Sequence, residues 1–249
     1  MPENSSIRST PSGNGKFATT HWSVVLAAGS PESSHYQEAL ETLCRTYWFP
    51  LYAYLRGRGY DRYQAEDYTQ SFFAALLEKP ALSRADPKRG KFRSFLLSSL
   101  KHFVADEQDR MRAKKRGGDK EIMSLDFENA ERRYGQEPAH NLSPEKLFER
   151  WWALGVLNQA MERLKTESST LHKQQLFDRL KVYLVAEKGA VTYKEISAEF
   201  GMTEAAVRVA AHRLKHRFHE LVREEIAQTV ADSSHIDEEI KDLFTALTS

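Results

Sequence analysis

Cationic side chains recur along one face of a predicted helix toward the end of the chain, and their spacing suits nucleic-acid recognition. At about 100° per residue of helix, Arg208, His212 and Lys215 fall on one side, with Arg213 on its flank. An arginine near the start of such a helix can donate two parallel hydrogen bonds to a guanine edge in the major groove. Lys215 and Arg217 lie further along, where a cation is expected to contact phosphate and so to position without specifying.

The residues before this helix predict a helix-turn-helix over residues 192–218. Thr192 and Glu195 have the spacing of a capping box, which starts a helix. Gly201 suits the left-handed turn residue, and Thr203 suits the cap of the next helix, whose N-terminal end meets base edges in this motif. The expected DNA-binding residues of this unit are Thr203, Glu204, Arg208, His212, Arg213, Lys215 and Arg217. A solvated charged helix in an ordinary bundle is the alternative reading of this face.

A second basic stretch lies about a hundred residues earlier, over residues 84–116. It holds eleven lysines and arginines against four acids, a net charge of +7. Aromatic side chains alternate with these cations, a combination that suits stacking on single-stranded bases, although Phe95 and Phe103 are expected to be core residues. The expected DNA-binding residues here are Lys88, Arg89, Lys91, Arg93, Lys101, His102, Arg110, Lys114, Lys115 and Arg116.

The elements that position these residues are expected to be helices. Apolar residues recur at three- and four-residue spacing over most of the 249 residues, and glycine and proline are scarce. We therefore predict an all-α protein with two helical domains joined by a flexible linker. The expected division is a disordered N-terminus with a short helix (1–33), a first helical domain (34–118), a linker (119–142), a second helical domain (143–230) and an acidic C-terminal helix (231–249).

Composition narrows the setting. The chain has one cysteine, Cys44, so no disulfide can form within it, and a reduced, cytoplasmic location is expected. No apolar run approaches the roughly 20 residues that would span a bilayer, and the polar N-terminus does not read as a signal peptide.

Residue patterns of enzyme chemistry are missing from the sequence. It contains no glycine-rich phosphate loop, no nucleophile elbow, no HExxH motif and no cysteine cluster, so we expect neither catalysis nor a cofactor. His212, His216 and His219 have spacing that zinc could use. No further ligand beyond Glu220 or Glu224 completes the set in this basic setting, and no metal site is expected.

Two segments together resemble a known family. They are "AEDYTQSFFAALLEK" (residues 65–79), followed by "ADPKRGKFRSFLLSSLKHFVADEQDRMRAKKR" (85–116), and "YKEISAEFGMTEAAVRVAAHRLKHRF" (193–218). In this order they resemble bacterial RNA polymerase sigma factors of the extracytoplasmic-function type. The resemblance covers about residues 36–118 and 143–226. It implies that the first domain corresponds to sigma domain two and the second, with the helix-turn-helix, to sigma domain four.

The resemblance implies partners and roles. Glu66, Asp67 and Gln70 match the surface that docks on the RNA polymerase core, and the helix within the first basic stretch matches the part that engages the minus-ten promoter element. The helix-turn-helix would then read the minus-thirty-five element. The chain departs from the family pattern at Ser71, at His102 and over residues 155–189. An anti-sigma factor is a further partner that the resemblance leaves open.

Two other functions fit the same residues. A dimeric helix-turn-helix regulator would bind duplex operators without polymerase, and a helical adaptor would use its basic faces to bind acidic partners. The tail over residues 232–249 carries a net charge of −4. This charge suggests the hypothesis that the tail folds back onto a basic DNA-binding face and restrains binding.

Overall fold

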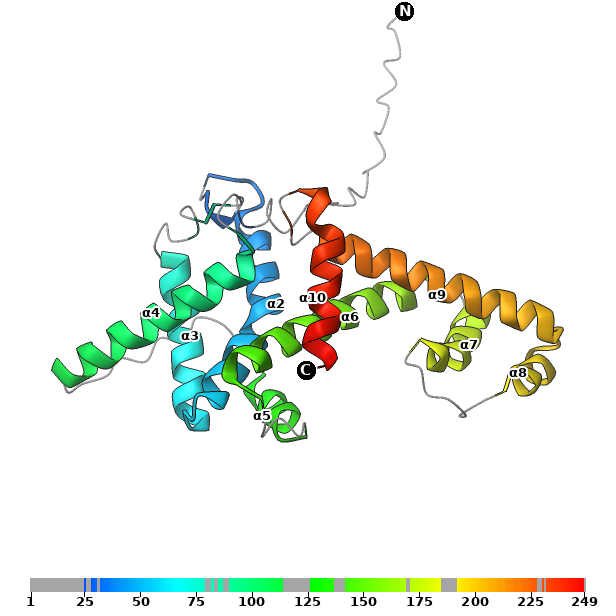
Figure 1. Cartoon of the computed structure of the whole chain (residues 1–249), viewed down its shortest axis with the longest axis horizontal. Coiled ribbons are helices and arrows are strands. Elements are labelled where there is room, and N and C mark those ends of the chain that lie inside the picture. Colours follow the sequence, from blue (N-terminus) through cyan, green and yellow to red (C-terminus); the bar gives the residue numbers. More distant parts are fainter. Residues whose placement is uncertain are drawn as a thin grey trace, which may run out of the picture.

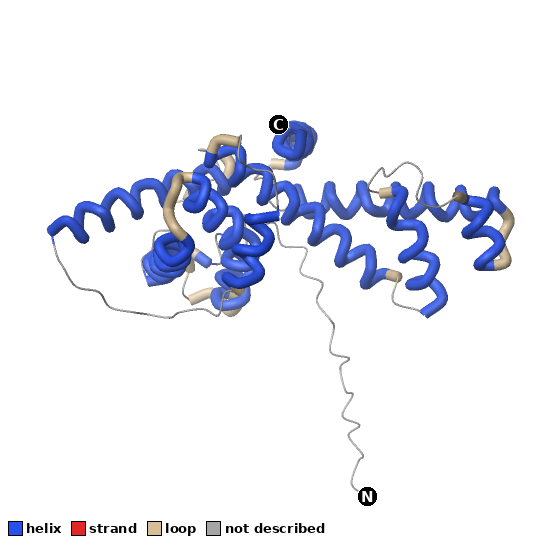
Figure 2. The backbone as a smooth tube through the Cα atoms, turned by 90° about the horizontal axis from the view of Figure 1, so that it is seen from below, coloured by secondary structure: helices blue, strands red, loops and turns tan. Residues whose placement is uncertain are grey.

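The computed structural model of the chain is built of helices, as Figures 1 and 2 show, and its described residues include no strand. The all-α prediction is therefore confirmed for this part of the chain. The structure describes residues 25, 28–30, 32–78, 82, 85–86, 90–113, 126–136, 142–168, 171–184, 192–227, 230 and 232–248.

Three helices form the first part of the fold: α2 (Tyr36–Gly57), α3 (Arg62–Glu78) and α4 (Phe92–Ala113). Apolar side chains repeat every three or four residues along α2, and all four members of one such row are buried: Leu43, Tyr47, Leu51 and Tyr54. Burial of that row holds α2 against its neighbours. The turn from α2 to α3 passes through Gly59, whose φ of 90° a residue with a Cβ would adopt only with strain.

Residues expected to form the linker contain a helix, α5 (Phe127–Gln136), which corrects the sequence prediction. Phe127 is buried beside Trp48 of α2, with ring centroids 5.6 Å apart. Glu131 accepts hydrogen bonds from Tyr52 and from Arg56, the latter at 2.7 Å. Burial opposes ionisation of Glu131, but these hydrogen bonds outweigh it and lower the carboxyl pKa. The mixed charge of this stretch concealed a helix that the surface of α2 stabilises.

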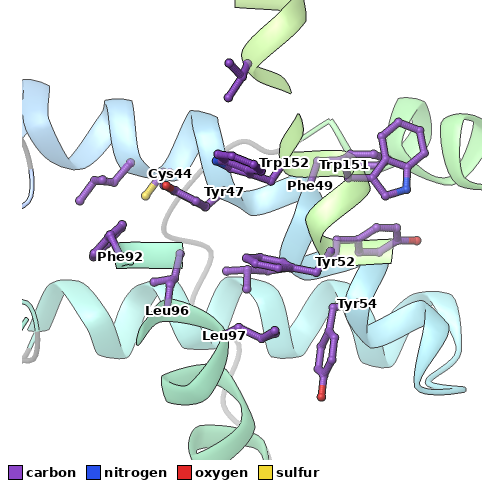
Figure 3. Packing of buried hydrophobic residues seen from close by; sticks show 14 of the residues in the cluster. Cys44, Tyr47, Phe49, Tyr52, Tyr54, Phe92, Leu96, Leu97, Trp151 and Trp152 are labelled. Atoms are coloured by element: carbon purple, nitrogen blue, oxygen red, sulfur yellow. The ribbon is translucent and has the colours of Figure 1, made fainter. Parts of the chain in front are cut away.

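Helix α6 (Pro144–Glu167) connects the two halves of the molecule. Ser143 caps it by accepting a hydrogen bond from the Lys146 amide at 3.3 Å, and proline occupies the first turn, as the sequence predicted. Near its start, Trp151 meets Phe49 of α2 edge to face, with ring centroids 4.5 Å apart (Figure 3). The buried face of α6 also includes Leu147, Phe148, Trp152, Ala153, Val156, Ala160 and Leu164.

One hydrophobic cluster therefore runs from α2 through α6 to the last two helices. These are α9 (Glu204–Ala227) and α10 (Ile236–Thr248), and α10 lies across both α6 and α9 (Figure 1). The expected boundary at residue 143 falls at the start of the helix that packs against both halves. Among the described residues, the two expected domains thus share a core.

A second, smaller core lies at the far end of α9. It joins α7 (Leu171–Leu180), the short 3-10 turn η4 (Lys181–Tyr183), α8 (Tyr193–Phe200) and the first turns of α9. Its buried side chains are Leu180, Ile196, Val207 and Ala211. Figure 1 places this unit at the opposite end of the molecule from α4.

The turn between α8 and α9 passes through Gly201, and a substitution there tests its backbone conformation. Gly201 has a φ of 62°, so Gly201→Ala should destabilise the protein by about 1–2 kcal/mol, although nothing lies within 4 Å of the added Cβ. The matched control is Gly155→Ala within α6, where the added Cβ also meets nothing and helix propensity predicts a gain of roughly 0.5–1 kcal/mol. Urea unfolding followed by circular dichroism measures both, and equal effects would contradict the left-handed turn.

Candidate nucleic-acid interface

Side-chain caps fix the starts of both helices of the predicted helix-turn-helix, α8 and α9. The Thr192 hydroxyl accepts from the Glu195 amide at 3.3 Å, and the Glu195 carboxylate accepts from the Thr192 amide at 2.7 Å. The predicted capping box is thus confirmed. The Thr203 hydroxyl accepts from the Ala206 amide at 3.2 Å and so begins α9. Thr203 and Glu204 consequently lie at the exposed start of α9, as the sequence predicted.

The first turns of α9 present a polar and cationic face to solvent. Val207 and Ala211 face the small core, which turns Arg208, His212, Arg213 and Lys215 outward, and all four are exposed. This face has the length of about three helical turns. The geometry is that of a helix able to enter a groove of duplex DNA with its N-terminal end leading.

Arg208 has the best-defined setting on this face. Its side chain is 65% exposed, its guanidinium lies 5.4 Å from the ring centroid of Tyr193, and Glu204 is 3.8 Å away. Stacking on a ring leaves the in-plane N–H donors of a guanidinium free to pair with a guanine edge. Tyr193 stacks in turn on Tyr183, with centroids 4.7 Å apart.

Val209 belongs to the same face, and the sequence analysis did not single it out. It is a large apolar residue left 50% exposed. The helical period alone could have identified it, because Val209 lies about 200° around the helix from the buried Val207. An apolar side chain at such a position can contact the methyl group of a thymine.

Arg217 is placed differently from the residues before it. It pairs with Glu167 at 2.7 Å, and with Glu220 and Glu224 at 3.1 Å each. The hydrogen bond to Glu167, with that to Glu220, raises the pKa of the Arg217 guanidinium. Glu167 lies at the end of α6, whereas Glu220 and Glu224 lie on α9 itself. Arg217 therefore links α9 to α6 through Glu167 in this structure rather than acting as an open phosphate contact.

Part of the first basic stretch lies outside the described residues: Lys88, Arg89, Lys114, Lys115 and Arg116. Of the remainder, His102 is exposed on α4, and Arg110 is exposed while pairing with Glu107 at 2.5 Å. Lys101 pairs with Glu145 at 2.8 Å, and that hydrogen bond raises the lysine pKa. Phe95 and Phe103 pack against the core, as expected.

Arg93 requires a correction, because the sequence analysis placed it on a DNA-binding surface and the structure buries it. It is 4% exposed. Its guanidinium lies 4.0 Å from the ring centroid of Trp152 and pairs with Glu149 at 2.7 Å, both on α6. From α10, Glu239 pairs with the same guanidinium and Asp242 lies 3.3 Å from it. A cation at the buried start of α4 is thus a packing element of three helices.

Lys91 shares the two α10 partners of Arg93. It pairs with Glu239 at 2.7 Å and with Asp242, so the acidic tail helix covers both cations at the start of α4. The acidic tail thus contacts two cations of the first basic stretch, while the hypothesis that it restrains DNA binding stays a prediction. The helix-turn-helix face of α9 carries none of these contacts.

The expected polymerase-binding residues lie on α3. Asp67 is exposed, Gln70 is half-buried, and Glu66 pairs with Arg62 at 2.7 Å. Tyr63, which the sequence analysis missed, is 78% exposed and lies one turn before Asp67 on the same face of α3. An exposed aromatic ring beside a carboxylate is typical of a protein-binding surface.

The described residues contain no group of three histidine, cysteine or acidic side chains arranged to hold a metal ion. His216 instead has its Nδ1 3.4 Å from Glu220. Of the helices that the structure describes, none has the length and apolar character needed to cross a membrane.

Comparisons with known proteins identify no relative: no family model, no curated protein and no solved structure matches the chain. The chemistry of its described surfaces is therefore the basis for assigning a function.

Removal of the Arg93 side chain tests its reassignment. Arg93→Ala leaves the carboxylate of Glu239 buried beside Lys91 alone, and loss of one partner from a buried ion pair costs about 3–5 kcal/mol. Arg110→Ala is the matched control, because its exposed pair with Glu107 contributes no more than about 0.5 kcal/mol. Thermal unfolding compares the stabilities of the two variants, and near-equal stabilities would contradict the burial of Arg93 in an ion pair.

Proposed function

We propose that this protein is a sigma initiation factor, which binds the core of bacterial RNA polymerase and directs it to promoters. The observation that carries the proposal is the exposed N-terminal face of α9. There, a capped helix-turn-helix presents Arg208, His212 and Arg213 without a covering element among the described residues. Such a face supports direct reading of base edges in the major groove. In the proposed function it reads the upstream, minus-thirty-five element.

The other end of the molecule supports the rest of the proposal. Exposed His102 and Arg110 lie along α4, and the cations that flank this helix in the sequence add positive charge there. This helix would engage the downstream, minus-ten element through its exposed cations, which suit contact with the phosphate backbone. On α3, Tyr63 and Asp67 would dock on the polymerase. The reaction itself belongs to the polymerase, and this chain supplies position and sequence choice.

Two substitutions on α9 separate base reading from phosphate binding. Arg208→Ala should cost about 1–3 kcal/mol at one upstream base pair and relax the choice of base there. Lys215→Ala should weaken all sequences about equally and reduce the slope of log K against log salt by roughly one. Competition binding to duplex libraries at several salt concentrations measures both. Identical effects would contradict the orientation proposed for α9.

A substitution on α3 tests the polymerase contact. Asp67→Ala should weaken binding to purified core polymerase by about tenfold or more, since a central contact of an interface contributes roughly 1–2 kcal/mol or more. Asp178→Ala, a half-exposed aspartate on α7, should leave that binding unchanged. Fluorescence anisotropy of the labelled full-length chain gives both constants.

The same titration tests the function as a whole. Saturable nanomolar binding of the wild-type chain to core polymerase, competed by another sigma factor, is the expected result. Absence of such binding together with tight binding to duplex DNA alone would favour a dimeric helix-turn-helix regulator.

A further inference from the structure

The ionic cluster where α4, α6 and α10 meet lies at the buried start of α4, before the exposed His102 and Arg110, and outside the helix-turn-helix. Its members come from three helices: Lys91 and Arg93 at the start of α4, Glu149 on α6, and Glu239 and Asp242 on α10, about 150 residues after the first two. Glu239 is only 1% exposed. Desolvated charges of opposite sign hold each other in place, because separating them leaves each one buried and unpaired.

Helix α10 also packs against α6 and α9, which lead to the half of the molecule that carries the helix-turn-helix. Ile236 and Leu243 are buried in the shared core, and α10 lies across α6 and α9 (Figure 1). The backbone carbonyl of Leu247 accepts a hydrogen bond from Arg150 of α6 at 2.7 Å. Arg223 of α9 pairs with Asp237 at 2.6 Å. A single short helix thus ties the start of α4 to both α6 and α9.

Helices α6 and α9 extend from this junction toward the helix-turn-helix, and α4 extends from it toward the other end of the molecule. Helix α6 has 24 residues, so it extends over about 36 Å. Arg163 near its end pairs with the buried Glu225 of α9 at 2.6 Å and with Glu224 at 2.5 Å. The helix-turn-helix lies at the distal end of α9, and the exposed part of α4 points the opposite way (Figures 1 and 2).

We propose that the contact of α10 with Lys91 and Arg93 fixes the distance and angle between the two DNA-reading helices. Arg93 and Glu239 then determine specificity for the length of DNA between the two promoter elements. This inference rests on the proposed function. Each added base pair moves one element by about 3.4 Å and rotates it by roughly 35° about the duplex axis. A protein held rigid at its centre cannot follow that change without losing contacts at one end.

The structure favours this role over simple masking of a DNA-binding surface by an acidic tail. Release of α10 would still leave Arg93 against Trp152 and paired with Glu149, both on α6. The guanidinium would therefore remain held by the core and would not become an open phosphate contact.

The first experiment measures rigidity in the free, full-length chain. Donor and acceptor dyes are placed on Ala105→Cys of α4 and Ala198→Cys of α8, which are both exposed. The native Cys44 is only 1% exposed, so the dyes do not reach it in the folded chain, and burial also raises the pKa of its thiol to about 12. Single-molecule energy transfer should give one narrow distance distribution.

Charge reversal in the cluster should broaden that distribution. Glu239→Lys places a third cation beside Lys91 and Arg93 and should detach α10, whereas Glu238→Lys makes the same charge change at an exposed neighbouring position and should have no effect. Circular dichroism checks that each variant stays helical. A deletion of residues 232–249 should reproduce the broadening if Glu239→Lys does not fold. A broad wild-type distribution, or a narrow one after deletion, would overturn the proposal.

The second experiment measures spacer choice in the reconstituted polymerase complex, on a promoter selected from random DNA by that complex. With the wild-type chain, moving the upstream element by one base pair should weaken binding about tenfold, roughly the effect of one lost base contact. With Glu239→Lys the loss should fall below about threefold, and with Glu238→Lys it should match the wild type. If Glu239→Lys instead strengthened DNA binding equally at every spacer length, the tail would act by masking, and the proposal would be overturned. If the chain does not bind core polymerase, the proposed function is wrong. The distance measurement would still decide whether the junction of α4, α6 and α10 is rigid.

Discussion

The guanidinium of Arg93 lies in the interior, where the indole of Trp152 covers one face and three carboxylates from two helices surround it. A buried charge is tolerated only when its partners stay in place, so this residue constrains α4, α6 and α10 together. Helix α6 packs directly against both α2 and α9, and α10 lies over α6 beside this junction.

Around this junction the molecule has a packed centre and two exposed ends. The centre consists of aromatic and aliphatic side chains from α2, α4, α6, α9 and α10, with the ionic cluster at its border. At one end, a small core orients the first turns of α9. At the other, α4 extends outward with His102 and Arg110 exposed. In the proposed function such an arrangement favours binding, because the cost of ordering two independent domains on the DNA is avoided if the fold has already ordered them.

The helix-turn-helix shows how far local chemistry can be read from sequence. Thr192, Glu195, Gly201 and Thr203 act on backbone groups within three residues of themselves, so their spacing was sufficient to predict the turn. The exposed face of α9 also followed from its helical period. The sequence analysis missed Val209 and Tyr63, although the same period indicates that Val209 faces away from the core. Tyr63 lies about 200° around α3 from the buried Ala65, so the helical period could have identified it as well.

The sequence by itself determined the helices other than α5, the caps of α6, α8 and α9, and the outward face of α9, since each depends on residues close in the chain. Only the tertiary structure decided which cations are available. Lys91 and Arg93 look like their neighbours in the sequence, yet Glu239 and Asp242, about 150 positions away, neutralise them. The tertiary structure also decided that α5 forms where a linker was expected, because α2 supplies Trp48, Tyr52 and Arg56 to hold it. Long-range charge pairing and the sharing of a core leave no periodic trace in a sequence, which is why these features could not be predicted from it.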